Sequence, residues 1–397
     1  MARGRAPGDC DDRVTGALAA RNAVAAAFVL NGLSFASLFS RVPDLRAGLG
    51  LDNAGLGALL LCGALGSVAA LPSAGPLIRR TSAGTVTRSG GVLVALGLVV
   101  VGIGATVLEQ VVVAGLGFLL YGVGVAVWDV AMNVEGAAVE RALGRSIMPR
   151  FHAGWSLGSV TGAGVAVVAT GLDLPMTVHL TLAALVVLSV IRVPSAYLPA
   201  HADAGEGSSL AAWRDPRTLG IGLMVMAFAL TEGAANDWLA LALIDGYDSP
   251  RWVGVAGFAL FVVAMSTGRI VGPVVLDRWG RVPVLRVTAV LALVGLLLLL
   301  LGGHPVVAGA GIVLWGLGAS LGFPVGMSAG ADDPARAAAR VSVVSTIGYT
   351  AFLAGPPALG HLGDRVGTLD ALWVVAVLLV PAMVLVSVAR EPEPVRT

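Results

Sequence analysis

The sequence predicts an all-α membrane protein with twelve transmembrane helices, arranged as two six-helix repeats around a central cavity. Hydrophobic residues make up 57% of the 397 residues and charged residues only 12%, whereas about 25% of the residues of a soluble domain are charged. The apolar runs are about 20 residues long, which is the length that crosses a bilayer. The chain contains 54 glycines, and glycine is enriched where membrane helices pack closely.

Turn and charge signals divide the apolar sequence into twelve expected spans. None of them shows the short alternating pattern of a transmembrane β-strand. The expected spans cover residues 17–40, 53–77, 86–108, 110–139, 150–171, 176–198, 217–244, 252–276, 283–303, 305–329, 338–362 and 367–389.

The positions of the arginines predict the orientation. All 25 basic residues are arginines, and with the N-terminus inside the outer loops hold four of them, so 25 − 4 = 21 lie in the tails, inner loops or inner halves of spans. This bias follows the positive-inside rule. The N-terminal segment has no signal-peptide cleavage pattern, so the first span is expected to be retained. We therefore expect a plasma-membrane protein with both termini in the cytoplasm.

Two halves are expected because the chain repeats part of its pattern. Gly117–Gly124 resembles Gly311–Gly318, 194 positions later, and each segment lies in the fourth span of its half. The alternative is chance similarity between glycine-rich helices. The predicted domains are an N-terminal six-helix bundle at 1–200, a cytoplasmic linker at 201–217 and a C-terminal six-helix bundle at 218–397. Two parallel repeats with a site at their interface are typical of secondary transporters.

Several function classes are excluded or disfavoured by the composition and by missing motifs. The composition excludes a cytosolic enzyme, a disordered protein and a secreted disulfide scaffold. The net charge of +1 provides no excess of positive charge that would bind nucleic acid. The two cysteines, Cys10 and Cys62, suggest neither a disulfide framework nor a metal site. No zinc-protease motif and no nucleotide-binding loop occurs in the sequence, so we expect that the protein is not an enzyme and binds no cofactor and no metal. We also expect a monomer.

Acidic residues within apolar spans mark functional positions, because a charge at the bilayer centre costs at least about 2.5–3.5 kcal/mol. Glu232 lies near the expected midplane of the seventh span, with Asn236 one turn later and Asp237 closer to the outside. A carboxylate that gains and loses a proton as a cavity opens to alternate sides would couple transport to protons. The alternative is a permanent hydrogen bond to a neighbouring span.

The fourth span carries a second polar stripe. On a helical wheel Trp128, Asp129, Asn133 and Glu135 fall within one arc of about 160°, and we expect this arc to face the cavity. Asp129, Glu135 and Asp237 are further candidates for proton coupling. Alternatively the stripe bonds neighbouring helices, and Glu135 pairs with Arg145 or Arg150.

Aromatic and amide side chains accompany the acids in the spans. Aromatic faces stack on C–H surfaces and amides bond hydroxyl groups, so the combination suits a sugar or cyclitol. Ordinary packing is the alternative for each tryptophan. The candidate substrate-binding residues are Asn31, Phe35, Trp128, Asn133, Trp155, Asn236 and Trp238.

Charged residues at the span ends are candidate gates. Arg41, Asp44 and Arg46 follow the first span, where Pro43 is expected to end the helix. They are expected to form salt bridges that close an outer gate. Arg269 in the eighth span either snorkels or pairs with Asp277 in an inner gate.

The loop after the eighth span reads Asp277-Arg278-Trp279-Gly280-Arg281. It resembles the loop signature of the major facilitator superfamily, Gly-x-Leu-x-Asp-Arg-x-Gly-Arg. The copy after the second span departs from this signature, because Arg79 stands where the family has Asp. The resemblance implies the superfamily fold for the whole chain and a gating role for Asp277, Arg278 and Arg281.

Five further segments resemble the YbjJ-like group of this superfamily, which is related to fucose-permease-type sugar–proton symporters. The segments are Ser40–Leu45, Trp128–Glu140, Phe151–Gly158, Glu232–Trp238 and Gly355–Pro357. Together with the polar residues in the spans, the resemblance predicts proton-coupled transport of a small polar solute across the bilayer by alternating access. The alternative is proton-driven efflux of a drug, an antibiotic or another lipophilic metabolite.

Overall fold

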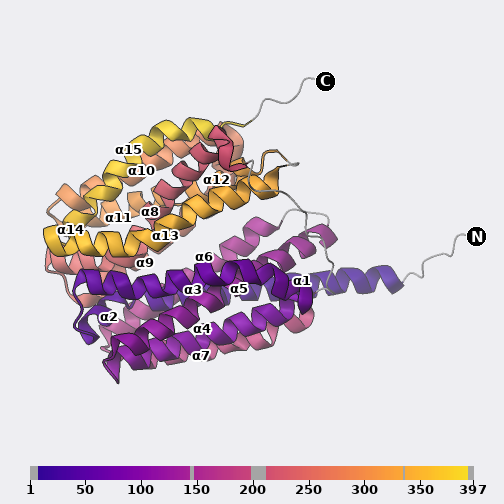
Figure 1. The fold of residues 1–397 in the computed structure, drawn as a ribbon, viewed down its shortest axis with the longest axis horizontal. Helices are drawn as coiled ribbons and strands as arrows, with labels where there is room; N and C mark the ends of the chain where they lie inside the picture. Colours follow the sequence, from indigo (N-terminus) through magenta and orange to yellow (C-terminus); the bar gives the residue numbers. More distant parts are fainter. Residues whose placement is uncertain (1–7, 144–146, 198–211, 334–335, 392–397) are drawn as a thin grey trace, which may run out of the picture. The chain divides into compact units, whose positions relative to one another are not determined.

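A computed structural model describes residues 8–143, 147–197, 212–333 and 336–391 of the chain. These residues form fifteen α-helices and four short 3₁₀ helices, and no strand occurs among them (Figure 1). The predicted all-α class is confirmed. The expected linker at 201–217 lies outside the described residues as far as residue 211.

The chain divides into two compact units. Unit 1 comprises Met1–Leu38 and Cys62–Asp203, and unit 2 comprises Phe39–Leu61 and Ala204–Thr397. Helix α3 therefore begins in unit 2 and continues in unit 1. The helices with most of their length in unit 1 are α1 (Gly8–Phe39), α3 (Asn53–Arg80), α4 (Ala83–Thr106), α5 (Val111–Leu143), α6 (Met148–Gly171) and α7 (Met176–Val187), the last followed by η1 (Leu188–Ile191) and η2 (Val193–Ala196).

Unit 2 holds the remaining helices. They are α2 (Val42–Gly48), η3 (Ala212–Arg214), α8 (Pro216–Tyr247), α9 (Arg251–Trp279), α10 (Arg281–Leu301), α11 (Pro305–Ala319), α12 (Gly322–Gly330), α13 (Ala337–Val366), α14 (Thr368–Ala371), α15 (Trp373–Leu385) and η4 (Val386–Ala389).

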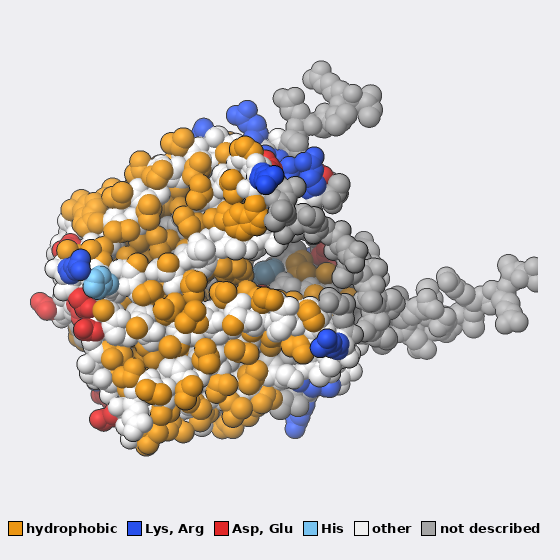
Figure 2. All heavy atoms as spheres, in the orientation of Figure 1, with side chains coloured by type: hydrophobic (Ala, Val, Ile, Leu, Met, Phe, Trp, Pro, Cys, Tyr) orange, Lys and Arg blue, Asp and Glu red, His pale blue; other side chains and the backbone are white. Residues whose placement is uncertain are grey.

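Eleven helical segments among the described residues are long and apolar enough to cross a membrane. The remaining expected span, 338–362, is helix α13, which has 30 residues but is less apolar, because it carries serine, threonine and proline. Large hydrophobic side chains are exposed on the outside of many of these helices. On the face that Figure 2 shows, hydrophobic side chains cover both units, and the charged side chains gather near the helix ends. Such a surface matches the hydrocarbon of a bilayer.

The expected span at 305–329 is not one continuous helix. It is divided into α11 and α12, with Ser320 and Leu321 between them. Pro324 explains the break, because proline has no N–H and cannot donate to the carbonyl four residues earlier, which is the carbonyl of Ser320. The sequence analysis missed this effect of Pro324.

The sequence led us to expect that Pro43 ends the first span, but it does not. Helix α1 already ends at Phe39, and Pro43 lies at the start of α2. Proline is favoured at the first positions of a helix, since the N–H groups there have no intrahelical acceptor. By contrast, α13 continues through Pro356 and Pro357.

Small residues hold the helices of unit 1 close together. The α3–α5 core is built largely of alanine, with Ala74 and Ala131 fully buried. Helix α6 lies against α1 at two glycines: side chains on Gly158 or Gly162 would collide with the backbone of α1. Gly164, on the same helix, has open space around it.

Helix α8 is the central helix of unit 2. All of its residues from Thr231 to Leu243 are buried, and it contacts α9, α12, α13 and α15. One apolar core joins α8 to α10 and α12, through side chains such as Phe228, Leu285 and Val325. A polar side chain in the middle of α8 is therefore surrounded by protein and needs a partner there.

Candidate functional site

A buried ion pair joins the middles of two transmembrane helices in unit 2. Glu232 lies halfway along α8, and Arg269 lies in α9, ten residues before its end at Trp279, which is about 15 Å along a helix. The Nη2 group of Arg269 donates to both carboxylate oxygens of Glu232, at 3.0 and 2.9 Å. The two side chains are only 23% and 11% exposed. The two opposite charges therefore neutralise each other within an apolar helix bundle.

This pair corrects the expected partner of Arg269. The sequence analysis expected Arg269 either to snorkel or to pair with Asp277. No ion pair of Asp277 occurs within the described part of the chain, and Asp277 is exposed. The reason is depth: Asp277 lies eight residues beyond Arg269, close to the end of α9, whereas Glu232 faces Arg269 from the neighbouring helix.

The break between α11 and α12 supplies a second partner. The Nε of Arg269 donates to the carbonyl oxygen of Ser320 at 3.3 Å, the carbonyl that Pro324 leaves without an intrahelical donor. Gly268 lies directly against Ser320, with no room for a side chain between them. Arg269 thus connects the carboxylate on α8 to an unsatisfied backbone group in the broken span.

The other polar residues predicted in the seventh span lie in α8, one to two turns beyond Glu232. Asn236, Asp237 and Trp238 are all buried. The Asn236 Oδ1 and the Trp238 Nε1 have no hydrogen-bond partner, and Asp237 has no partner among the described residues. Trp238 packs against α13, where a Cβ on Gly360 would lie 3.1 Å from its ring. These groups do not belong to the Glu232–Arg269 pair.

The polar stripe of α5 satisfies itself in part within its own helix. The Asn133 Nδ2 donates to the backbone oxygen of Asp129 at 2.9 Å and to its carboxylate at 3.3 Å. Glu135 is buried. Trp128 is fully buried, and its Cβ would lie 2.8 Å from a Cβ on Gly90 of α4. Trp128 therefore packs on α4, and its indole N–H has no hydrogen-bond partner.

Three of the predicted substrate-binding residues come together in unit 1. The Trp155 Nε1 of α6 donates to the Asn31 Oδ1 of α1 at 3.0 Å. The rings of Phe35 and Trp155 are 5.5 Å apart and tilted by 44°. Asn31 is buried, whereas Phe35 and Trp155 are half-buried. An amide and two aromatic faces thus form one cluster at the α1–α6 crossing.

The predicted outer-gate residues form ion pairs within unit 2. The Arg41 Nε lies 2.8 Å from the Asp44 carboxylate, whose other oxygen lies 3.3 Å from Arg251 at the start of α9. Burial lowers the pKa of Arg41 although Asp44 opposes the shift. Arg46 makes a two-pronged bond to Asp245 at the end of α8. The sequence analysis missed Asp245, because it lies at the end of an apolar run, where a charge is ordinary.

The two arginines of the loop signature between α9 and α10 make different contacts. Arg281 pairs with Asp332, whose side chain is 7% exposed, at 2.7 Å. It also bonds Ser328 at 3.1 Å and lies 3.5 Å from Glu391. Arg278 is exposed and lies over the ring of its neighbour Trp279.

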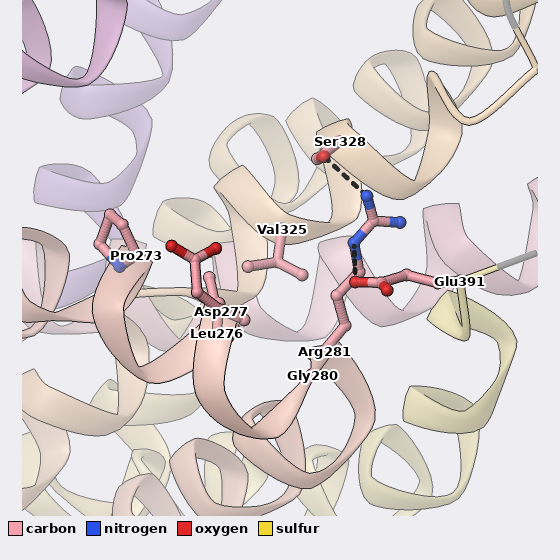
Figure 3. A pocket seen from close by; sticks show the side chains of 8 residues that line it. All are labelled: Pro273, Leu276, Asp277, Gly280, Arg281, Val325, Ser328 and Glu391. Atoms are coloured by element: carbon pink, nitrogen blue, oxygen red, sulfur yellow. Dashed lines mark hydrogen bonds and ion pairs between the residues drawn. The ribbon is translucent and has the colours of Figure 1, made fainter. Parts of the chain in front are cut away.

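These contacts surround a cavity of about 450 Å³ at the end of unit 2. Figure 3 shows Arg281 directed toward Ser328 and Glu391, with Asp277 apart from them. Asp332, which the sequence analysis missed, also bonds Arg217 at 2.7 Å. It therefore joins the starts of α8 and α10 to the chain after α12.

Asp215 begins α8 in the same region. Burial alone would raise its pKa, but hydrogen bonds from Thr218 and from the backbone N–H of Arg217, together with the charge of Arg340, outweigh burial and hold the pKa below the usual value. The Arg340 guanidinium lies 2.9 Å from the Asp215 carboxylate. No cluster of ligands that would hold a metal occurs in the described part of the chain.

Apolar helices with a compensated charge pair near their middles are typical of membrane transport proteins. The family model described as Major Facilitator Superfamily matches residues 24–356. The chain is 32% identical to an uncharacterized MFS-type transporter of Yersinia pestis over 362 residues, which cover 89% of this chain and 91% of that protein. The chain therefore belongs to the major facilitator superfamily, whose members are transporters and not enzymes.

Solved structures show the same fold. A mutant form of the nucleoside transporter NupG has a TM-score of 0.76 at 14% identity, with 94% of this chain and 99% of that chain covered. A mutant form of the Escherichia coli fucose:proton symporter FucP has a TM-score of 0.64 at 16% identity, with 94% and 98% covered. At this level of identity the likeness shows the fold alone.

Proposed function

We propose that this transporter moves a small polar solute, sugar- or cyclitol-like, across the plasma membrane by proton-coupled alternating access. The observation that carries the proposal is the Glu232–Arg269 pair in the middle of unit 2. The moving bodies would be the two six-helix halves, 1–200 and 218–397, joined by the linker 201–217, with both termini in the cytoplasm. We also propose that the chain belongs to the YbjJ-like group.

The pair provides a reason for coupling. While Glu232 is ionised, it neutralises Arg269 and accepts two hydrogen bonds from it. Protonation of Glu232 removes the negative charge and leaves the guanidinium uncompensated among apolar helices, which is unfavourable. The protonated state is therefore favoured only when another group, such as a polar solute or water, solvates Arg269. Proton binding and solute binding then depend on each other.

The polar groups of each unit support a hydroxyl-bearing solute. Unit 1 offers the amide of Asn31 beside the faces of Phe35 and Trp155. Unit 2 offers the unbonded Asn236 Oδ1 and Trp238 Nε1, one acceptor and one donor. The solved structures with this fold include proteins titled as transporters of a nucleoside and of fucose, both polar and hydroxyl-rich molecules.

The test begins with the solute. Shifts of Tm across a panel of sugars, cyclitols, nucleosides and amino acids identify a ligand of the purified protein. Uptake of this ligand into proteoliposomes is then measured with and without a proton gradient. We expect the gradient to drive accumulation by the wild-type protein, and Glu232→Gln to bind the solute but lose accumulation.

Glu109→Gln is the matched control, because Glu109 is an exposed residue between α4 and α5. It should accumulate solute as the wild type does. Gradient-driven accumulation by Glu232→Gln at the wild-type rate would remove Glu232 from the coupling role.

A further inference from the structure

The broken span α11–α12 contacts both helices that carry the Glu232–Arg269 pair. Its Trp315, in α11, is fully buried, and the indole Nε1 donates to the carbonyl oxygen of Thr231 at 3.1 Å. Thr231 directly precedes Glu232 in α8. A carbonyl oxygen has two lone pairs, so a carbonyl within a helix can accept this additional hydrogen bond. Trp315 therefore holds α8 at the residue next to the carboxylate.

The break itself is packed closely on both helices. Gly268, which precedes Arg269 in α9, lies directly against Ser320, and Gly322 lies as closely against the ring of Phe228 in α8. A side chain at either glycine would collide with its neighbour. Backbone packed in this way has little freedom to move, so the Ser320 carbonyl keeps a fixed place beside the guanidinium that donates to it.

The contribution of the broken span does not change when Glu232 takes up a proton. Neither α11 nor α12 contains a charged residue or a histidine. The span therefore acts on the pair through a backbone carbonyl and an indole N–H, and neither group titrates in the physiological range. The Ser320 carbonyl is thus an acceptor that remains for Arg269 after the carboxylate has lost its charge.

Helices α9, α12, α13 and α15 pack on α8, and their other charged residues lie toward the helix ends. Helices α12 and α15 contain none. Those of α9 and α13, with the histidine of α13, lie within six residues of an end: Arg251, Asp277, Arg278, Arg340, His361, Asp364 and Arg365. In α8 itself, Asp237 lies five residues beyond Glu232, about 7.5 Å along the helix.

We propose that the break between α11 and α12 positions both members of the Glu232–Arg269 pair. Trp315 fixes α8 at the carboxylate. The Ser320 carbonyl, which Pro324 leaves without a helical donor, keeps the guanidinium in place while Glu232 is protonated. Without this acceptor the guanidinium would be unbonded among apolar helices and would turn toward water at the helix end. Trp315, Ser320 and Pro324 are positioning residues, and the inference rests on the proposed function, in which Glu232 gains and loses a proton.

A double-mutant cycle, measured by equilibrium unfolding of the purified, full-length protein, tests the Ser320 anchor. Glu232→Gln imitates the protonated acid with a neutral amide, and Pro324→Ala returns an N–H donor to the Ser320 carbonyl. Alone, Pro324→Ala should change the folding equilibrium constant little, because the regained helical bond offsets the greater freedom of the unfolded chain. Combined with Glu232→Gln, it should lower the constant at least about tenfold beyond the product of the single effects, which corresponds to about 1.4 kcal/mol.

Pro381→Ala is the matched control for this cycle. Pro381 also lies inside a helix of unit 2, α15, but the carbonyl that lacks its N–H is that of Val377, whose side chain is exposed. Its effect should therefore be additive with that of Glu232→Gln. Additive effects of Pro324→Ala and Glu232→Gln, or an equal departure from additivity with Pro381→Ala, would overturn the anchoring role of Ser320.

Trp315→Phe tests the other half of the proposal and leaves the break unchanged. Phenylalanine keeps a ring beside Phe261, whose ring centroid lies 5.5 Å from that of Trp315, but it cannot donate to Thr231. We expect the coupling between Glu232→Gln and Arg269→Gln to fall at least about threefold in the Trp315→Phe background.

The control for Trp315→Phe is Trp238→Phe, the same chemical change at a buried position of α8 whose indole N–H has no hydrogen-bond partner. It should leave the coupling of the pair unchanged. Undiminished coupling in Trp315→Phe, or an equal fall in Trp238→Phe, would overturn the role of Trp315.

These cycles use neither solute nor gradient, so their outcome is separate from that of the uptake assay. Non-additivity together with proton-driven accumulation by Glu232→Gln would support the positioning role and contradict the proposed coupling. Additivity together with loss of accumulation by Glu232→Gln would support the coupling and overturn the positioning role.

Discussion

Helices α5 and α8 carry the same polar pattern and use it differently. Each has a carboxylate followed one turn later by asparagine: Asp129 and Asn133 in α5, Glu232 and Asn236 in α8. In α5 the asparagine bonds back to the acid of its own helix. In α8 the acid forms an ion pair with an arginine of α9, and the asparagine oxygen has no hydrogen-bond partner.

The difference comes from the neighbouring helices. The helices that pack on α5 present small and apolar residues to it, such as Ala74 and Gly90. The helix that packs on α8 presents Arg269, anchored by the Ser320 carbonyl. An acid in a membrane helix is therefore a local hydrogen-bonding group in one setting and half of an ion pair in the other, and the sequence spacing is identical.

The largest effect that would test this comparison is the loss of Arg269. Arg269→Gln leaves the Glu232 carboxylate uncompensated, and breaking a buried ion pair costs about 3–5 kcal/mol. The double variant Glu232→Gln/Arg269→Gln removes both charges and should recover most of the loss. Equilibrium unfolding of the purified protein measures both. A double variant as unstable as Arg269→Gln would show that the charge of Glu232 is not what destabilises the single variant.

A medium effect is expected for the contact between α1 and α6. Hydrogen bonds between membrane helices contribute about 0.6 kcal/mol on average and up to about 1.7 kcal/mol. Trp155→Phe keeps a ring beside Phe35 but removes the donor to Asn31, so we expect a loss in this range. A double-mutant cycle with Asn31→Ala isolates the bond. Additive losses in the cycle would mean that the bond contributes nothing.

The smallest effect is expected in α5. The bonds of Asn133 stay within one helix, where side-chain pairs contribute about 0.2–0.5 kcal/mol, so Asn133→Ala should change the unfolding free energy by no more than this amount. The matched variant is Val134→Ala, at a neighbouring position that is 45% exposed. A loss for Asn133→Ala comparable with that of Arg269→Gln would abolish the distinction between the two helices.

Much of the fold was predictable because each span is a local property of the chain. The composition of each apolar run indicated its membrane span, and eleven runs meet the requirement in the structure. The exceptions depend on single residues. Pro324 divides one expected span into two helices, and Pro43 begins a helix instead of ending one.

The candidate site was predictable only as a set of residues. The sequence pointed to Glu232 and Arg269 separately, because charges in apolar runs are rare and costly. It expected Arg269 to snorkel or to pair with Asp277, and it did not consider Glu232, since Asp277 is close in sequence and Glu232 is not. Asp245 and Asp332 were missed because each lies at the end of an apolar run, where a charge needs no special explanation.

The sequence by itself determined the class of protein, the approximate positions of its membrane helices, and the few polar residues that interrupt them. These properties follow from hydrophobicity and from the thickness of a bilayer, and both act on one segment at a time. Only the tertiary structure decided which charges meet. A pair such as Glu232 and Arg269, or Arg281 and Asp332, depends on the depth and rotation of each helix against its neighbours, and close packing between helices sets those quantities.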